Sequence, residues 1–134
     1  MKVRILGSGG SFGSPLAWQR NGKIDINNKR NFRTRSSVLV NINDTNILID
    51  TSPDLRKQLY DAKCTQINAV LFTHCHYDHT SGLPDMSAIS LINDKVIPAF
   101  APIEMQDEML NHYKFIFHGE KDYKPFMKFN YVKN

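Results

Sequence analysis

Three histidines and one aspartate fall within six consecutive residues, at positions 74–79. Imidazole nitrogens and carboxylate oxygens are ligands that zinc and similar divalent metals take in proteins. A continuous apolar run at residues 67–72 comes directly before them and is typical of a strand buried on both faces. In extended backbone the first two histidines point to the same side, and a turn into a helix then carries the aspartate and the last histidine to a second point nearby. We therefore expect a metal site at the end of this strand, with four ligands: His74, His76, Asp78 and His79.

The remaining histidines and the cysteines lack such a setting. His112 and His118 each stand alone in an aromatic and polar segment, so we interpret neither as a ligand. Cys64 and Cys75 are too few for a disulfide framework, and we interpret both as reduced, buried thiols.

The segments around the cluster predict an alternation of strands and helices. Residues 37–42 and 45–50 are β-rich and flank an Asn-Asp pair, which favours a two-residue hairpin turn. A helix is expected next, with Ser52 as its N-cap, proline at its first position and an end near residue 62. Later elements are predicted as a helix around residues 86–92, a strand at 95–99, a helix within 102–113 and a strand at 128–132.

Two loops precede these elements. The first strand, at residues 2–6, runs into a stretch rich in glycine and serine at residues 7–15, which indicates a tight turn where backbone approaches closely. It matches neither the Walker phosphate loop nor the dinucleotide-binding glycine pattern. The chain is then polar, rich in asparagine and basic as far as Arg35, and we expect a long loop there that is functional or mobile.

Length and composition indicate one soluble globular domain over residues 1–134, with 41% hydrophobic and 22% charged residues. Residues 1–36 carry eight Lys/Arg against a single acidic residue, whereas residues 37–110 carry four against ten Asp/Glu. The acidic middle suits a cation, and the basic arm from Arg20 to Arg35 suits an anionic substrate such as a phosphate ester or RNA, or is simply a solvated loop. No apolar run is long enough to cross a bilayer and no signal-peptide pattern opens the chain, so we expect a cytoplasmic protein without membrane contact.

The pattern His-x-His-x-Asp-His at residues 74–79 resembles the signature of the metallo-β-lactamase superfamily. Residues 48–56, residues 82–86 and the Arg-x-Arg-Ser-Ser at residues 33–37 are similar to the branch related to phosphoribosyl cyclic-phosphate phosphodiesterase. The resemblance extends from residue 1 to about residue 113. It implies an α/β (α+β) fold, the αββα sandwich with two β-sheets between helices, of which residues 1–134 would form the N-terminal half.

The same resemblance implies roles for individual residues. His74 and His76 would hold a first divalent metal, and Asp78 and His79 a second, with zinc expected and manganese as the alternative. The two ions would carry a bridging hydroxide that attacks the substrate, which makes Asp78 a catalytic residue as well as a ligand. Asp50, at the end of its strand, resembles the family's acidic residue that lies behind the metal ligands and steadies the histidine loop. The competing interpretation of Asp50 is a turn residue that leads into the next helix.

The expected function is metal-dependent hydrolysis of a phosphodiester or cyclic phosphate in a small or nucleotide-like substrate. One alternative is a truncated or split fragment that retains some metal binding without turnover. Another is an RNA 3′-end processing nuclease, with nucleic acid as a less favoured partner. Because the family takes further ligands from a second half, we expect the chain to need a complementary C-terminal chain or a second copy of itself.

Overall fold

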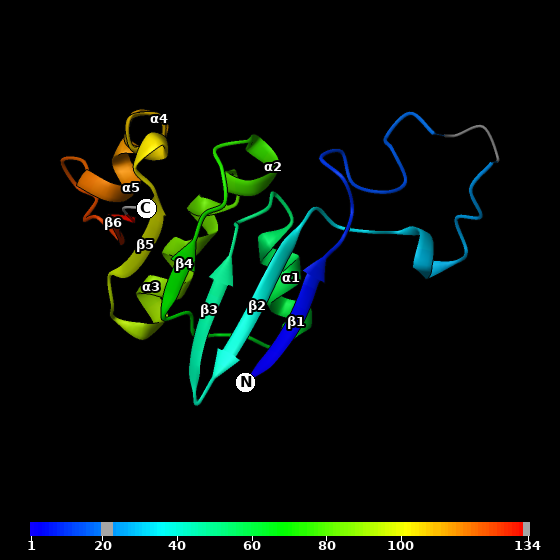
Figure 1. The fold of residues 1–134 in the computed structure, drawn as a ribbon, viewed down its shortest axis with the longest axis horizontal. Helices are drawn as coiled ribbons and strands as arrows, with labels where there is room; N and C mark the ends of the chain where they lie inside the picture. Colours follow the sequence, from blue (N-terminus) through cyan, green and yellow to red (C-terminus); the bar gives the residue numbers. More distant parts are fainter. Residues whose placement is uncertain (20–22, 133–134) are drawn as a thin grey trace.

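The computed structural model describes residues 1–19 and 23–132, and its centre is one six-stranded sheet (Figure 1). The strands stand side by side in sequence order: β1 (Lys2–Gly7), β2 (Ser37–Ile42), β3 (Thr45–Ile49), β4 (Ala69–Leu71), β5 (Ile97–Pro102) and β6 (Met127–Val132). The first three pair antiparallel, and β3 to β6 pair parallel. The expected mixed α/β architecture is therefore confirmed.

Helices connect the parallel strands. The α-helices are α1 (Leu55–Ala62), α2 (Tyr77–Thr80), α3 (Met86–Asn93), α4 (Gln106–His112) and α5 (Lys114–His118), with short 3-10 turns at Lys29–Asn31, Leu83–Asp85 and Ile103–Met105. Within the described residues, none of these helices is long and apolar enough to cross a membrane.

The hairpin between β2 and β3 forms as predicted. Asn43 and Asp44 have φ angles of 43° and 65°, and positive φ at both central residues gives the turn whose twist matches two antiparallel strands. Asparagine and aspartate tolerate this left-handed backbone better than most residues. The hairpin fixes where β3 ends, and β3 leads directly to Asp50.

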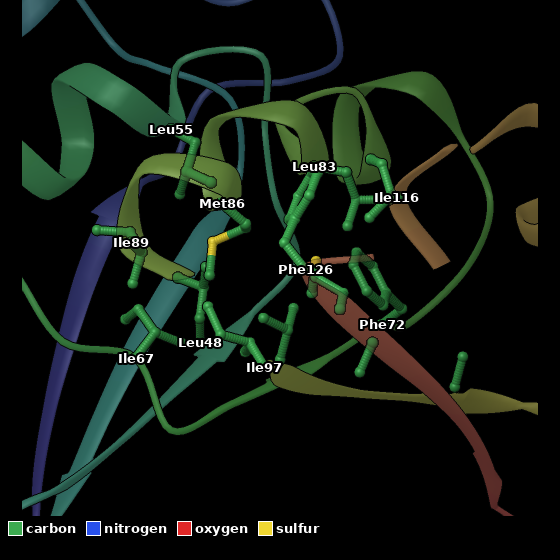
Figure 2. Close-up of a cluster of buried hydrophobic side chains, with 14 of the residues drawn as sticks. Leu48, Leu55, Ile67, Phe72, Leu83, Met86, Ile89, Ile97, Ile116 and Phe126 are labelled. Atoms are coloured by element: carbon green, nitrogen blue, oxygen red, sulfur yellow. The ribbon is translucent and has the colours of Figure 1, made fainter. Parts of the chain in front are cut away.

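The core lies between the sheet and helices α1 and α3. Figure 2 shows Leu55, Met86 and Ile89 from these helices facing Leu48 and Ile97 of the sheet. Leu48, Leu55 and Met86 are fully buried. This packing anchors the strands whose ends carry the histidine cluster.

The opposite face of the sheet is open. Along β2 the residues alternate, so that Leu39 is buried while Val38 and Val40 on the other side are only partly covered. On the neighbouring β1, Val3 and Ile5 are 57% and 61% exposed. We call this the open face; the residues that line it are Val3, Ile5, Val38, Val40, Ile47, Ile49, Leu71 and Phe100.

Several predicted boundaries need correction. Helix α1 begins at Leu55 with Asp54 as its cap, so the prediction that Ser52 caps it is wrong. Ser52 Oγ instead accepts from the backbone N–H of Asp54 at 3.1 Å, which forms a local turn before the helix. Strand β4 covers only Ala69–Leu71 of the expected 67–72, and β5 runs later than expected, over Ile97–Pro102. The predicted helix at 86–92 and strand at 128–132 are confirmed within a residue.

Candidate metal centre

The histidine cluster lies where β3 and β4 end. These strands are parallel, with Ile47 opposite Ala69 and Ile49 opposite Leu71, so their carboxyl ends meet at one edge of the sheet. Asp50 follows β3, and His74 comes three residues after β4. Figure 1 shows α2, which carries Asp78 and His79, above these two strand ends.

All four predicted ligands come together at this edge. The ring centroid of His74 is 4.6 Å from that of His76 and 4.0 Å from that of His79. Asp78 Oδ2 is 3.3 Å from His79 Nε2. Asp78 is buried and His76 is exposed, so the cluster runs from the protein interior to solvent. The expected convergence at the strand ends is present, and metal binding by these residues stays a prediction.

Asp50 supports the cluster from below. Its carboxylate accepts from the backbone N–H of Thr73 at 2.8 Å, from Thr73 Oγ1 at 2.7 Å and from His79 Nδ1 at 2.7 Å. Only 5% of Asp50 is exposed, and its φ of 59° turns the chain sharply after β3. These contacts favour the supporting role of Asp50 over a plain turn residue.

The hydrogen bonds of Asp50 also determine which ring nitrogens are available. A carboxylate only accepts, so His79 Nδ1 donates to Asp50, which leaves Nε2 as the ring nitrogen available to a metal ion. Thr73 Oγ1 donates to Asp50 and is therefore free to accept from His74 Nδ1, 2.9 Å away. His74 Nε2 is then likewise the ring nitrogen available to a metal ion. A single buried carboxylate thus prepares two histidines as metal ligands, one directly and one through Thr73.

Asp78 is held as a carboxylate. Burial acts to raise its pKa, but a hydrogen bond from Ser11, a backbone hydrogen bond and the nearby rings of His79 and His74 lower the pKa below the usual value for aspartate. Ser11 belongs to the glycine-rich loop after β1, so this loop contacts the cluster directly. Composition alone indicated a close-approach loop there without identifying Ser11.

A second polar connection ties the basic arm to α2. Asp54 accepts from Arg35 twice, from the guanidinium Nη1 at 2.8 Å and from the backbone N–H at 2.9 Å. Arg35 Nη2 donates to the hydroxyl of Tyr77 at 3.1 Å, and Tyr77 lies between His76 and Asp78 in the chain. Partial burial works against the charge of Arg35, but the hydrogen bond to Asp54 raises its pKa. Sequence reasoning missed this connection, because its partners lie 19 and 42 residues apart.

Close packing holds α2 in place. Thr51 N–H donates to the carbonyl of His79 and Gly82 N–H donates to the carbonyl of Thr51, at 2.8 and 2.9 Å. A Cβ atom on Gly82 would lie 2.1 Å from the backbone oxygen of Ser52, so glycine is needed there for the chains to approach.

The donor chemistry of the cluster fits zinc, since three imidazoles and a carboxylate are gathered and the Nδ1 atoms of His74 and His79 already have hydrogen-bond partners. Among residues 1–19 and 23–132, however, no three His, Cys, Asp or Glu side chains are already arranged around one point as a metal would require. The four side chains lie near one another, and their binding of a metal ion stays a prediction.

The other candidate residues lie elsewhere. His112 is exposed on α4, with Nδ1 at 4.0 Å from Glu108, and His118 is exposed at the end of α5. Cys64 and Cys75 are free thiols; burial raises the pKa of both, that of Cys75 to about 11, with the nearby Glu108 adding to the shift.

Comparison with known proteins agrees with this geometry. The beta-lactamase superfamily domain matches residues 45–132, which include Asp50, the histidine cluster and all strands from β3 onward. The chain belongs to the beta-lactamase superfamily. The recognised resemblance is therefore confirmed at the level of the superfamily.

Curated relatives match this superfamily chain over part of their length. An octanoyltransferase of Porphyromonas gingivalis is 41% identical over 91 residues, which are 66% of this chain and 18% of that protein. A coenzyme PQQ synthesis protein B of Acinetobacter baumannii is 33% identical over 102 residues, covering 62% of this chain and 32% of that protein. The chain thus spans less than a third of either relative.

Solved structures show the same fold. A diphosphatase of the PhnP family superimposes with a TM-score of 0.85 and 28% identity over 98% of this chain and 50% of that one. Zinc-bound PqqB from Methylobacterium extorquens superimposes with a TM-score of 0.71 and 24% identity, and this chain covers 46% of it. The short form of human tRNase Z superimposes with a TM-score of 0.66 and 21% identity, and this chain covers 45% of it. The residues described here correspond to about half of the metallo-β-lactamase fold.

Proposed function

We propose that this chain supplies the N-terminal ligand set of a dinuclear metallohydrolase that cleaves a phosphodiester or a cyclic phosphate. The observation that carries the proposal is the convergence of His74, His76, His79 and Asp78 above buried Asp50. The likeness to a PhnP-family diphosphatase at 28% identity supports a phosphate-ester substrate, either a small molecule or a nucleotide-like compound.

In this proposal His74 and His76 bind one divalent ion, and Asp78 and His79 bind the other. Zinc is proposed because the donors are mostly imidazole, and manganese is the alternative. When bound, such ions would supply a water of lowered pKa and a positive charge that polarises a phosphoryl oxygen, as phosphodiester hydrolysis requires. The chain's own contribution is to orient His79 through Asp50 and to keep Asp78 ionised through Ser11. The cytoplasm is proposed as its compartment, because two cysteines are too few for the disulfide framework of a small secreted domain.

The number of ligands in the cluster implies that further polypeptide completes the site. A zinc site takes about three or four protein ligands, and four residues divided between two ions leave each with about two. The open face likewise presents apolar side chains that a second sheet would cover. We infer that polypeptide outside residues 1–134, or a second copy of the chain, supplies further ligands and covers the open face. The chain by itself then binds metal weakly and does not turn over.

Metal binding by the purified 134-residue chain is the first test. Calorimetry with zinc should show weak binding that His76→Ala abolishes, whereas His118→Ala, a substitution of the same type at an exposed position outside the cluster, should leave it unchanged. Equal loss in both variants, or no binding at all, would refute the proposed ligand set.

Turnover is the second test, with bis(p-nitrophenyl) phosphate as substrate. The part of the PhnP-family diphosphatase that this chain does not cover serves as a surrogate complement, because this chain superimposes on the other 50% of that protein. We expect hydrolysis only in the mixture, and its loss on Asp78→Ala. A monomeric 134-residue chain that hydrolyses the substrate without a complement would contradict the inferred need for one.

A further inference from the structure

A cavity of about 630 Å³ lies beside the metal centre, between the basic arm and the edge of the sheet. Strand β1 and helix α1 form one side, and the glycine-rich loop together with residues 29–35 forms the other. Its volume lies within the range of small-molecule binding sites. We call it the arm pocket.

Aromatic side chains stand at the wall of the arm pocket. Phe12 and Phe32 both line it and are 67% and 53% exposed, and exposed apolar side chains that gather in one place mark a contact surface. Trp18 packs edge-on against Phe12 with ring centroids 5.7 Å apart. Flat rings of this kind are the surfaces on which heterocyclic bases stack.

The charge of the arm pocket favours an anion. Four cationic side chains and two carboxylates line it. Both carboxylates are already paired: Asp54 with Arg35, and Asp61 with Lys57 on the next turn of α1. This leaves Lys29 and Arg33 as uncompensated charges, and the hydrogen bonds of the described residues commit one guanidinium donor of Arg33, to Ser8 Oγ. A guanidinium has five donors, so Arg33 retains several for a phosphate group.

The arm pocket adjoins the histidine cluster through one side chain. Arg35 lines the pocket and donates to the hydroxyl of Tyr77, the residue between His76 and Asp78. Ser11, in the same loop as Phe12, contacts Asp78. A ligand that fills the pocket therefore lies next to the centre where hydrolysis is proposed to occur.

We propose that the arm pocket binds one nucleoside phosphate unit of the substrate. The base stacks on Phe12 or Phe32, and its phosphate binds Arg33 and Lys29. The scissile phosphate of the same substrate then reaches the histidine cluster. This proposal rests on the proposed function for the second phosphate, but binding in the pocket itself needs no metal and no turnover.

The chain carries a reporter for this binding. Trp18 is its single tryptophan and contacts Phe12 at the pocket wall. We expect AMP, titrated in the presence of a metal chelator, to change the fluorescence of Trp18 in a saturable way. AMP should bind at least tenfold tighter than inorganic phosphate or adenosine, because only AMP combines a base with a phosphate. Equal affinity for AMP and phosphate would overturn the proposal.

Variants locate the site. Arg33→Ala and Phe32→Leu should each weaken AMP binding about tenfold, the effect of one charge-assisted hydrogen bond or one stacking contact. Lys124→Ala, which removes an equal charge from a different cavity, is the matched control and should leave the affinity unchanged. A similar loss for all three would reduce the effect to non-specific attraction and refute the site.

Two further measurements complete the design. A trinucleotide that binds tighter than AMP would assign the pocket to the end of a nucleic acid, whereas weaker binding would assign it to a free nucleotide. In either case the pocket binds a stacked base and its phosphate. The AMP titration contains chelator, so it measures binding without metal. If AMP binds but the reconstituted mixture does not hydrolyse bis(p-nitrophenyl) phosphate, the proposed function is refuted and the arm pocket is not. Hydrolysis without AMP binding would refute the arm pocket alone.

Discussion

Replacing Asp50 by asparagine tests whether one buried carboxylate prepares the metal ligands. Asparagine has nearly the same shape and tolerates the φ of 59° at this position, so the backbone turn should survive. The amide oxygen can still accept from the N–H of Thr73. Its NH₂ group, however, faces His79 Nδ1, which now has to accept a hydrogen bond. His79 then carries its proton on Nε2, where it blocks metal coordination.

The expected size of the effect follows from the contacts that are lost. Hydrogen bonds to a charged group contribute about 1.5–3 kcal/mol each, and the amide retains part of the three that Asp50 accepts. We expect Asp50→Asn to lower the free energy of unfolding by about 2 kcal/mol. Zinc affinity should fall further, by about 10- to 100-fold, as for other groups that orient metal-binding histidines.

Two assays separate these effects. Urea unfolding measures stability, and zinc calorimetry measures affinity on protein that is still folded. Thr73→Val removes the hydroxyl between Asp50 and His74 and should weaken zinc binding less, while Thr73→Ser keeps the hydroxyl and serves as the control. If Asp50→Asn binds zinc like the original chain, the argument from ring tautomers is wrong, whatever the loss of stability.

Three other outcomes are expected. Gly82→Ala should lower the melting temperature by several degrees because its Cβ would meet backbone at 2.1 Å, whereas Gly10→Ala, with nothing within 4 Å, should not, as thermal unfolding would show. Modification of Cys75 by a disulfide reagent should be slow at pH 8 and accelerate toward pH 11, because its pKa is raised to about 11; a rate that levels off near pH 9 would contradict this. Folding stability should correspondingly fall between pH 9 and 11, since the folded thiol holds its proton over that range while the unfolded one loses it; unfolding curves with no such fall would contradict it.

Local sequence predicted the elements that depend on neighbouring residues. The hairpin followed from two β-rich runs and an Asn-Asp turn, and the convergence of the histidines followed from their spacing after an apolar run. The start of α1 was misjudged because Ser52 has the right side chain for a cap but is fully buried and uses its hydroxyl in the preceding turn. Residue type alone does not reveal which of two adjacent turns a serine stabilises.

Contacts between distant segments were beyond the reach of the sequence. Nothing in the residues around Arg35 indicates that its guanidinium meets Tyr77, 42 positions later, because this contact depends on the order of the strands in the sheet. The same holds for Ser11 and Asp78. The basic arm was recognised from its charge, but its place beside the histidine cluster came only with the fold.

The open face links the two parts of the proposed function. Strands β2 to β5 bury the side that faces α1 and α3, and the alternation of residues along each strand necessarily turns the other apolar side chains outward. Helices on one side of the sheet therefore cannot cover those residues, however well they pack. Two of the strands that create this face, β3 and β4, also end at Asp50 and the histidine cluster, so whatever covers the face is brought close to that cluster. A polypeptide that buries the open face is for this reason well placed to supply the ligands that His74, His76, Asp78 and His79 leave unfilled.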